Sequence, residues 1–128
     1  MSILAMSPFQ KRLLKLIKEY VHYVYKINKL FPKEEMFGAS SQLKRAGLSI
    51  LLNYTEGFTR IRKKVQLNFF EIAYGSLHET LILLEFALEE EWLNKEQYNF
   101  IFKTGDEIGA MLWSEIESVK NRINNESA

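Results

Sequence analysis

The sequence predicts an all-α protein, an antiparallel up-down-up-down four-helix bundle. Apolar residues recur at three- and four-residue steps along four long segments, about 8–31, 40–58, 62–91 and 95–123. The connections between these segments are short, and no segment carries the pattern of a strand. With 128 residues, only 2 prolines and 6 glycines, the chain suits one domain, 1–128, with one hydrophobic core.

The first helix is predicted to begin at Ser7-Pro8, where a capping serine precedes a proline at the first helical position. It should end at Phe31-Pro32, because the residue before a proline is pushed out of helical geometry. Its stripe repeats every three or four residues and comprises Phe9, Leu13, Leu16, Ile17, Tyr20, Val21, Val24, Ile27 and Phe31.

The second helix, capped by Ser40 or Ser41, carries two apolar strips. The broad strip comprises Leu43, Ala46, Gly47, Ile50, Leu51, Tyr54, Gly57 and Phe58. Leu48 and Leu52 lie nearly opposite it at 100° per residue. A helix of a monomeric bundle needs only one apolar stripe, so we expect a second chain to cover these two leucines. The alternative is that they are ordinary exposed leucines, which soluble proteins tolerate.

Glycines and polar residues suggest how the last two helices pack. Gly75, in the middle of the third helix, predicts close approach of a neighbouring helix. Gly105 and Gly109 predict another such contact on the fourth helix. Asn94 and Gln97 form the pattern of a capping box at its start. We expect the two ends of the chain, 1–6 and 124–128, to be frayed.

A cluster of positive charge marks the corner between the second and third helices. Arg60, Arg62, Lys63 and Lys64 place four cations in five residues, with no acid among them. A phosphate backbone is the usual partner of such a cluster. The alternative is a solvated corner whose charges only aid solubility.

The formal net charge of +1 hides an asymmetry between the two halves of the chain. Residues 1–64 hold 13 Lys/Arg against 4 Asp/Glu, whereas residues 65–128 hold 4 against 12. The basic half could face nucleic acid. Alternatively, the basic side of one subunit could meet the acidic side of the next in a head-to-tail assembly.

Composition excludes several classes of function. There is no cysteine, so disulfides, thiolate catalysis and Cys-type zinc sites are excluded. The sequence has no run of about 18 apolar residues, which is the length that a membrane-spanning helix needs. The N-terminus has the wrong order of apolar and charged residues for a secretory signal, so we expect a cytoplasmic protein.

Chemistry at an active site is not expected either. Glu19 and His22 form a single Glu-x-x-His motif, whereas a bundle metal site needs two. No hydrolytic triad or phosphate-binding loop can be assembled. Glu56 and Glu79 could approach each other, but such carboxylates are more often partners within a bundle. We therefore expect no enzyme, metal, cofactor or small-molecule substrate.

Four sequence blocks carry a resemblance to a known family. FPKEEMFG, SQLKRAGLSI, NYTEGFTR and FFEIAYGSLHET, in this order and spacing, resemble the bacterial four-helix bundle proteins encoded in intervening sequences of 23S rRNA genes, the S23-type proteins. Those proteins are similar to the accessory variability proteins of diversity-generating retroelements. Where the family commonly has a Ser-x-x-Glu cap at the third helix, this chain has Arg62 and Val65. The cap is therefore expected to be lost, unless Thr59 caps an earlier start.

The resemblance implies a homopentameric ring and no established enzymatic activity. For the retroelement relatives it implies binding of RNA and of a reverse transcriptase. We therefore predict an oligomeric, non-enzymatic scaffold that binds RNA or DNA. Its predicted contacts are cationic and comprise Lys44, Arg45, Arg60, Arg62, Lys63 and Lys64. The alternative is a protein-interaction module that docks a partner such as a reverse transcriptase and touches nucleic acid little.

Overall fold

The computed structural model describes residues 5–127 and confirms the predicted four-helix bundle. Its long helices are α1 (Pro8–Asn28), α2 (Ala39–Thr59), α3 (Lys63–Glu89) and α4 (Lys95–Ser127). A short 3₁₀ helix, η2 (Lys33–Glu35), lies in the connection between α1 and α2. The sequence did not predict this turn.

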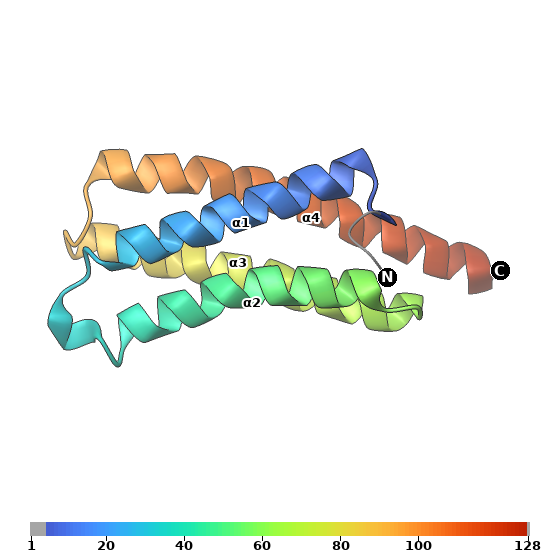
Figure 1. The fold of residues 1–128 in the computed structure, drawn as a ribbon, viewed down its shortest axis with the longest axis horizontal. Coiled ribbons are helices and arrows are strands. Elements are labelled where there is room, and N and C mark those ends of the chain that lie inside the picture. Colours follow the sequence, from blue (N-terminus) through green and yellow to red (C-terminus); the bar gives the residue numbers. More distant parts are fainter. Residues whose placement is uncertain (1–4, 128) are drawn as a thin grey trace.

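Each helix packs antiparallel against its neighbours, and the four neighbouring pairs are α1–α2, α2–α3, α3–α4 and α4–α1 (Figure 1). In the view of Figure 1, α1 and α2 lie in front of α4 and α3. The corner between α2 and α3 lies at the same end of the bundle as the end of α4, which projects beyond the other helices.

Local capping explains where α1 and α4 begin. The Ser7 hydroxyl accepts a hydrogen bond from the Gln10 backbone N–H at 3.1 Å, and the Gln10 side chain accepts one from the Ser7 N–H at 2.9 Å. Asn94 and Gln97 make the same reciprocal pair at the start of α4. Both predicted starts are therefore confirmed. These boxes satisfy N–H groups that have no partner within the helix.

The predicted caps of α2 are wrong. Gly38 occupies the N-cap position, and neither Ser40 nor Ser41 accepts a capping hydrogen bond there. The Glu35 carboxylate instead accepts from the Ala39 N–H at 3.2 Å. Ser40 is buried inside the first turn, where its carbonyl accepts a hydrogen bond from the Asn28 side chain at 2.9 Å. This bond fastens the start of α2 to the end of α1, which stops at Asn28 rather than at residue 31.

One hydrophobic core runs through the bundle. Its largest fully buried side chains are Tyr20, Tyr54, Phe70, Leu13, Ile17, Leu43, Ile50, Leu77, Leu84, Ile101, Ile108 and Leu112. Met6 is also buried in this core, although residues 1–6 were expected to fray; residues 1–4 lie outside the described part. Residues 124–127, also expected to fray, continue α4, and residue 128 is outside the described part.

The glycines show which helix contacts are tight. A Cβ atom at Gly105 would lie 3.0 Å from both Leu81 and Tyr20, so the predicted close approach is confirmed there. A Cβ at Gly109 would lie 3.4 Å from Leu77. The prediction for Gly75 is wrong, because no heavy atom of a neighbouring residue lies within 4 Å of the Cβ position. Gly75 is exposed on the outside of α3.

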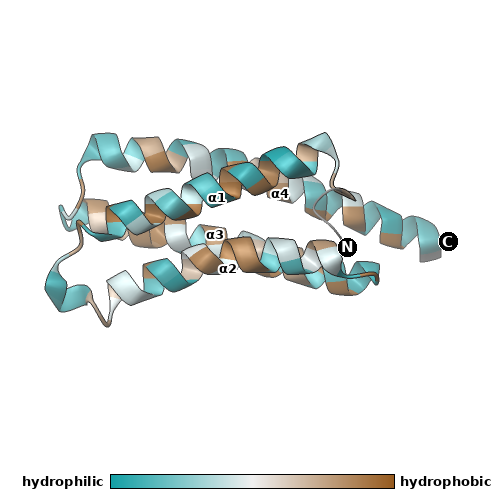
Figure 2. Cartoon of the chain, in the orientation of Figure 1, coloured by the Kyte–Doolittle hydropathy of each residue, from teal (hydrophilic) through white to brown (hydrophobic). Residues whose placement is uncertain are grey.

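Hydropathy varies along the helices, and the middle of α2 is hydrophobic (Figure 2). Among the described residues, no helix has an apolar stretch of the length needed to cross a membrane.

Candidate nucleic-acid interface

The positive corner is a tight connection between two antiparallel helices. Thr59 ends α2, and Arg62 is the N-cap residue of α3. Gly57 permits the tight packing beneath it, because a Cβ there would lie 2.9 Å from the buried Phe70 ring. The Gln66 side chain donates a hydrogen bond to the Gly57 carbonyl at 3.1 Å, which ties the start of α3 to the end of α2. The cations of the corner therefore stand on a rigid base.

Arg60 is partly neutralised within its own helix. Its guanidinium forms an ion pair with the Glu56 carboxylate, and it lies over the Phe69 ring at 5.2 Å from the centroid. The ion pair and the ring contact hold the guanidinium in place. Arg60 therefore presents less net positive charge than the sequence suggested.

The other three cations of the corner share the N-terminus of α3. Arg62 and Lys64 are exposed and Lys63 is half-buried, and none of them belongs to an ion pair among the described residues. No acidic residue lies in the first turn of α3, and no side chain caps it. The helix dipole adds partial positive charge at this end, where free backbone N–H groups also point outward. The arrangement suits a bound anion such as phosphate.

Two predictions about this end need correction. Thr59 does not cap α3; it belongs to α2, where its hydroxyl donates to the Glu56 carbonyl at 2.8 Å. The corner is also less purely positive than the sequence indicates. Glu126, near the end of α4, lines the same shallow hollow as Arg62, Lys63 and Lys64. An anion bound there would meet one acid beside three cations.

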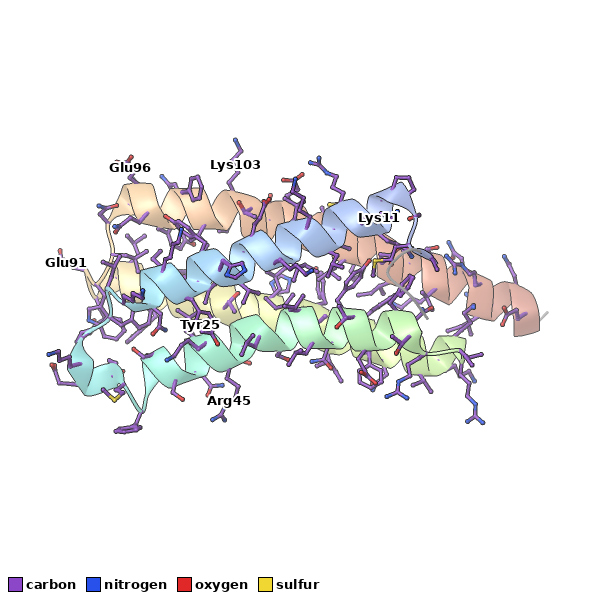
Figure 3. All side chains as sticks on the ribbon, viewed as in Figure 1. Lys11, Tyr25, Arg45, Glu91, Glu96 and Lys103 are labelled. Atoms are coloured by element: carbon purple, nitrogen blue, oxygen red, sulfur yellow. The ribbon has the colours of Figure 1, made fainter. Side chains whose placement is uncertain are left out.

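Lys44 and Arg45 do not join this corner. Both are exposed near the start of α2, and 15 residues separate Arg45 from Arg60, about 22 Å along a helix. Figure 3 shows Arg45 projecting away from the bundle. No ion pair among the described residues includes Arg45. The predicted contacts thus form two separate patches.

The predicted interface residues lie on the outer side of α2. Leu48 is 38% exposed and Leu52 is 60% exposed. Both are directed away from Leu43, Ile50 and Tyr54, which fill the core. The second apolar strip therefore exists on the surface of the isolated chain.

The carboxylates that could have formed a reactive pair are far apart. Glu79 accepts a hydrogen bond from Gln42, whereas Glu56 pairs with Arg60. Gln42 and Glu56 are 14 residues apart on α2, about 21 Å along the helix. Glu79 lies beside Gln42, so it does not approach Glu56. Among the described residues, no group of three or more His, Asp or Glu side chains could hold a metal ion.

One buried carboxylate was missed by sequence reasoning. Glu115 of α4 is buried and accepts hydrogen bonds from the Tyr54 hydroxyl at 3.3 Å and from the Gln10 side chain at 3.4 Å. Burial raises its pKa above the usual range of glutamate, and these two bonds and the charge of Arg122 partly offset that rise. Its place in the apolar stripe, three residues after Leu112, was the available signal. Glu115 joins three helices and is not open to a ligand.

The sequence pattern of one protein family matches most of this chain. The sequence pattern of the 23S rRNA-intervening sequence proteins matches residues 11–114, which include most of α1, all of α2 and α3 with the corner between them, and most of α4. The chain belongs to this family. The predicted resemblance to the S23-type proteins is thereby confirmed.

A solved member of the family shares the fold. It is a protein of unknown function from the S23 ribosomal protein family of Bacteroides thetaiotaomicron, whose crystal structure was determined at 1.70 Å resolution. The two proteins are 27% identical, with a TM-score of 0.76. The similarity covers 81% of this chain and 97% of the Bacteroides chain. No curated protein matches the sequence.

Proposed function

We propose that this member of the 23S rRNA-intervening sequence family is a non-enzymatic, homo-oligomeric protein that binds the phosphate backbone of RNA or DNA. The observation that carries the proposal is the start of α3, where Arg62, Lys63 and Lys64 surround an uncapped helix N-terminus. Cations, a helix dipole and unpaired N–H groups favour the same ligand, a phosphate. Arg60 is a secondary contact because Glu56 already engages it.

Binding of this kind should not depend on base sequence. Of the described residues, those that line the hollows at the corner include cations but no aromatic ring on which bases could stack. In a ring the corner would occur once per subunit, and several weak phosphate contacts to one strand would reinforce each other. The resemblance of four sequence blocks to the S23-type proteins implies, for their retroelement relatives, binding of RNA, and this supports the same proposal.

The test is to replace Arg62, Lys63 and Lys64 with glutamine and to measure binding of labelled single-stranded RNA and duplex DNA between about 50 and 200 mM salt. The plot of log K against log salt has a negative slope, and each lost phosphate contact should make it shallower by about 0.7 for a single strand. The expected result is weaker binding to every sequence and, for single-stranded RNA, a slope that is shallower by about 2.

A matched control removes the same charge elsewhere. Lys33, Lys95 and Lys103 are exposed and belong to no ion pair among the described residues. Their replacement with glutamine should leave the slope nearly unchanged. Equal losses in both triple variants would mean that only net charge matters, and unchanged binding in the corner variant would place the site elsewhere. The lysines of α1 would then be the next candidates.

A second function has its own supporting observation. Ile61 lies between the cations of the corner and is 87% exposed, which phosphate binding does not require. A protein partner, such as the reverse transcriptase implied by the retroelement relatives, could cover this side chain. Ile61→Ser should then weaken binding to that partner at all salt concentrations while leaving RNA binding intact. Loss of RNA binding in this variant would argue against the division of roles.

A further inference from the structure

Two long faces of the bundle lie on opposite sides of the molecule. α1 contacts α2 and α3 contacts α4, while α1 and α3 are diagonal, as are α2 and α4. The outer side of the α1–α2 pair faces the viewer in Figure 1, and that of the α3–α4 pair faces away. We refer to them as the basic face and the acidic face, for the charges described next.

The basic face has an apolar centre and cationic surroundings. Its exposed residues are Lys11, Lys18, Tyr25, Lys44, Leu48 and Leu52. The bond from Asn28 to Ser40 and the contact of Val24 with Gly47 set the register, so Tyr25 lies level with Lys44, and Lys18 with Leu52. Figure 3 shows Tyr25 at the junction of the two helices and Lys11 farther along α1.

Among the described residues, the two helices of the basic face carry few acids. α1 and α2 contain one acidic residue each, Glu19 and Glu56. Glu19 lines a cleft of about 200 Å³ between α1 and α4, together with Tyr23 and Phe100. Glu56 is directed towards Arg60 at the corner. Glu19 also lines a shallow hollow on α1 with Lys11 and Lys18, so it lies at the edge of the basic face. The three lysines of the face, Lys11, Lys18 and Lys44, still outnumber this one acid.

The acidic face also has an apolar centre. Its exposed apolar residues are Ile82, Phe102 and Trp113, at 65%, 40% and 49% exposure. Tyr74 of α3 packs on Trp113 with ring centroids 5.7 Å apart, and Phe102 stacks on Tyr98 at the same distance. These rings form two separate aromatic clusters, one between α3 and α4 and one within α4.

Carboxylates lie around the apolar residues of the acidic face. The exposed acids on the outer sides of α3 and α4 are Glu71, Glu85, Glu89 and Asp106, none of which belongs to an ion pair among the described residues. Glu85 lies near Tyr98, where its charge contributes to the raised pKa of the phenol after burial, the larger cause. Lys95 lies near the start of α4, and the Lys120 ammonium lies over the Trp113 ring, 5.6 Å from its centroid. The face is therefore negative around Ile82 and Phe102 and carries one cation beside Trp113.

We propose that the acidic face of one copy of this chain binds the basic face of the next copy. The inference rests on the homo-oligomer of the proposed function and specifies which surfaces form it. Each face places apolar side chains in the centre and charges around them, as stable interfaces do. The charges are opposite in sign, which steers encounter and rejects pairing of like faces. Because the two faces are different surfaces of one molecule, the contact is heterologous and a ring can close.

The size of the faces is sufficient for such a contact. A 21-residue helix such as α1 or α2 is about 31 Å long, and two packed helices present a width of about 20 Å. Each face thus offers about 600 Å², and an interface would bury about 1,200 Å² in total, at the lower end of the range for specific protein complexes. A surface built for a different partner would have no reason to match the opposite face of its own molecule in both charge and apolar content.

The test uses two variants, each with one damaged face. Leu48→Glu with Leu52→Glu places charges in the basic face, and Ile82→Glu with Phe102→Glu does so in the acidic face. Light scattering after size-exclusion chromatography should give each variant the mass of one 15.1 kDa chain, with helicity retained in circular dichroism. Mixed in equal amounts, the two should form a dimer of twice that mass and nothing larger, because each retains one intact face.

A control and a charge exchange complete the experiment. Leu30→Glu with Phe37→Glu changes exposed apolar residues in the connection between α1 and α2, and this variant should keep the wild-type mass. Glu85→Lys with Asp106→Lys should weaken assembly at least ten-fold, and adding Lys18→Glu with Lys44→Glu to the same chain should restore it.

The outcomes separate this inference from the proposed function. A wild-type protein that stays monomeric at micromolar concentration would overturn both the proposed oligomer and these faces. An assembled wild type whose two face variants also stay assembled would overturn the faces alone. Two monomeric variants that fail to dimerise when mixed would show that the faces do not bind each other. RNA binding by the corner is measured in a separate experiment, and its outcome does not affect the interpretation of these assembly measurements.

Discussion

Two glycines of this chain have opposite surroundings, and the same substitution should have opposite effects. A Cβ at Gly57 would lie 2.9 Å from the buried Phe70 ring, whereas one at Gly75 would meet nothing within 4 Å. Gly75→Ala should raise the free energy of unfolding by about 0.5–1 kcal/mol through helix propensity. Gly57→Ala should lower it by about 1–3 kcal/mol, because overpacking outweighs that gain. Urea denaturation of both variants at one protein concentration gives the two signs, and equal signs would contradict the packing described for Gly57.

The buried Glu115 should make stability depend on pH. Its folded-state pKa is raised by burial, so the folded chain holds this proton more tightly than the unfolded chain. As pH rises through and above the ordinary range of glutamate, ionising Glu115 lowers the free energy of unfolding; below that range the cost is absent. Glu115→Gln should therefore stabilise the protein at pH 7, since an amide can still accept the hydrogen bond from Tyr54.

The gain from Glu115→Gln should shrink as pH falls towards the ordinary pKa of glutamate. Urea denaturation between pH 5 and 8 measures it, at fixed protein concentration because assembly also affects apparent stability. Glu126→Gln is a suitable control, because Glu126 is exposed. If Glu115→Gln raises the free energy of unfolding by the same amount at every pH, the rise does not come from removing the carboxylate charge.

At the scale of the element, the N-cap of α3 is a cation that does not stabilise the helix as a capping side chain would. Its N-cap is Arg62, in extended conformation, with no side-chain hydrogen bond to the first turn. Ser, Thr, Asp and Asn are the residues that stabilise this position. An arginine there leaves the first N–H groups of α3 available and adds a cation beside them.

Arg62→Ser should raise the free energy of unfolding by about 0.5–1 kcal/mol while weakening RNA binding. Arg62→Gln removes the same charge without supplying a good cap, so it should weaken binding equally with little change in stability. Thermal unfolding and an RNA titration on both variants separate the two effects. Tighter RNA binding by the serine variant would contradict the role of Arg62 as an anion contact.

At the scale of the whole molecule, the proposed assembly and the proposed binding are linked. If corners from several subunits engage one strand, separating the subunits should weaken binding to long RNA much more than to short RNA. Leu48→Glu with Leu52→Glu leaves every corner residue in place. For an RNA of about 40 nucleotides its affinity should fall at least ten-fold, whereas an oligonucleotide short enough for one corner should bind as before. Equal losses for both lengths would show that the leucines act on the corner itself.

The sequence by itself determined the features that depend on residues close along the chain. The capping boxes of Ser7 with Gln10 and of Asn94 with Gln97 follow from an i to i+3 geometry that exists within one turn. The apolar stripes likewise identified the core, because the period of a helix places such residues on one side. The exposure of Leu48 and Leu52 was predicted for the same reason.

Only the tertiary structure decided how the helices slide and rotate against each other. That register sets Glu79 beside Gln42 and far from Glu56, and it leaves Gly75 open while Gly57 is covered. It also brings Glu126 into the positive corner. The register results from packing the side chains of all four helices at once, so no pattern within a single helix contains it.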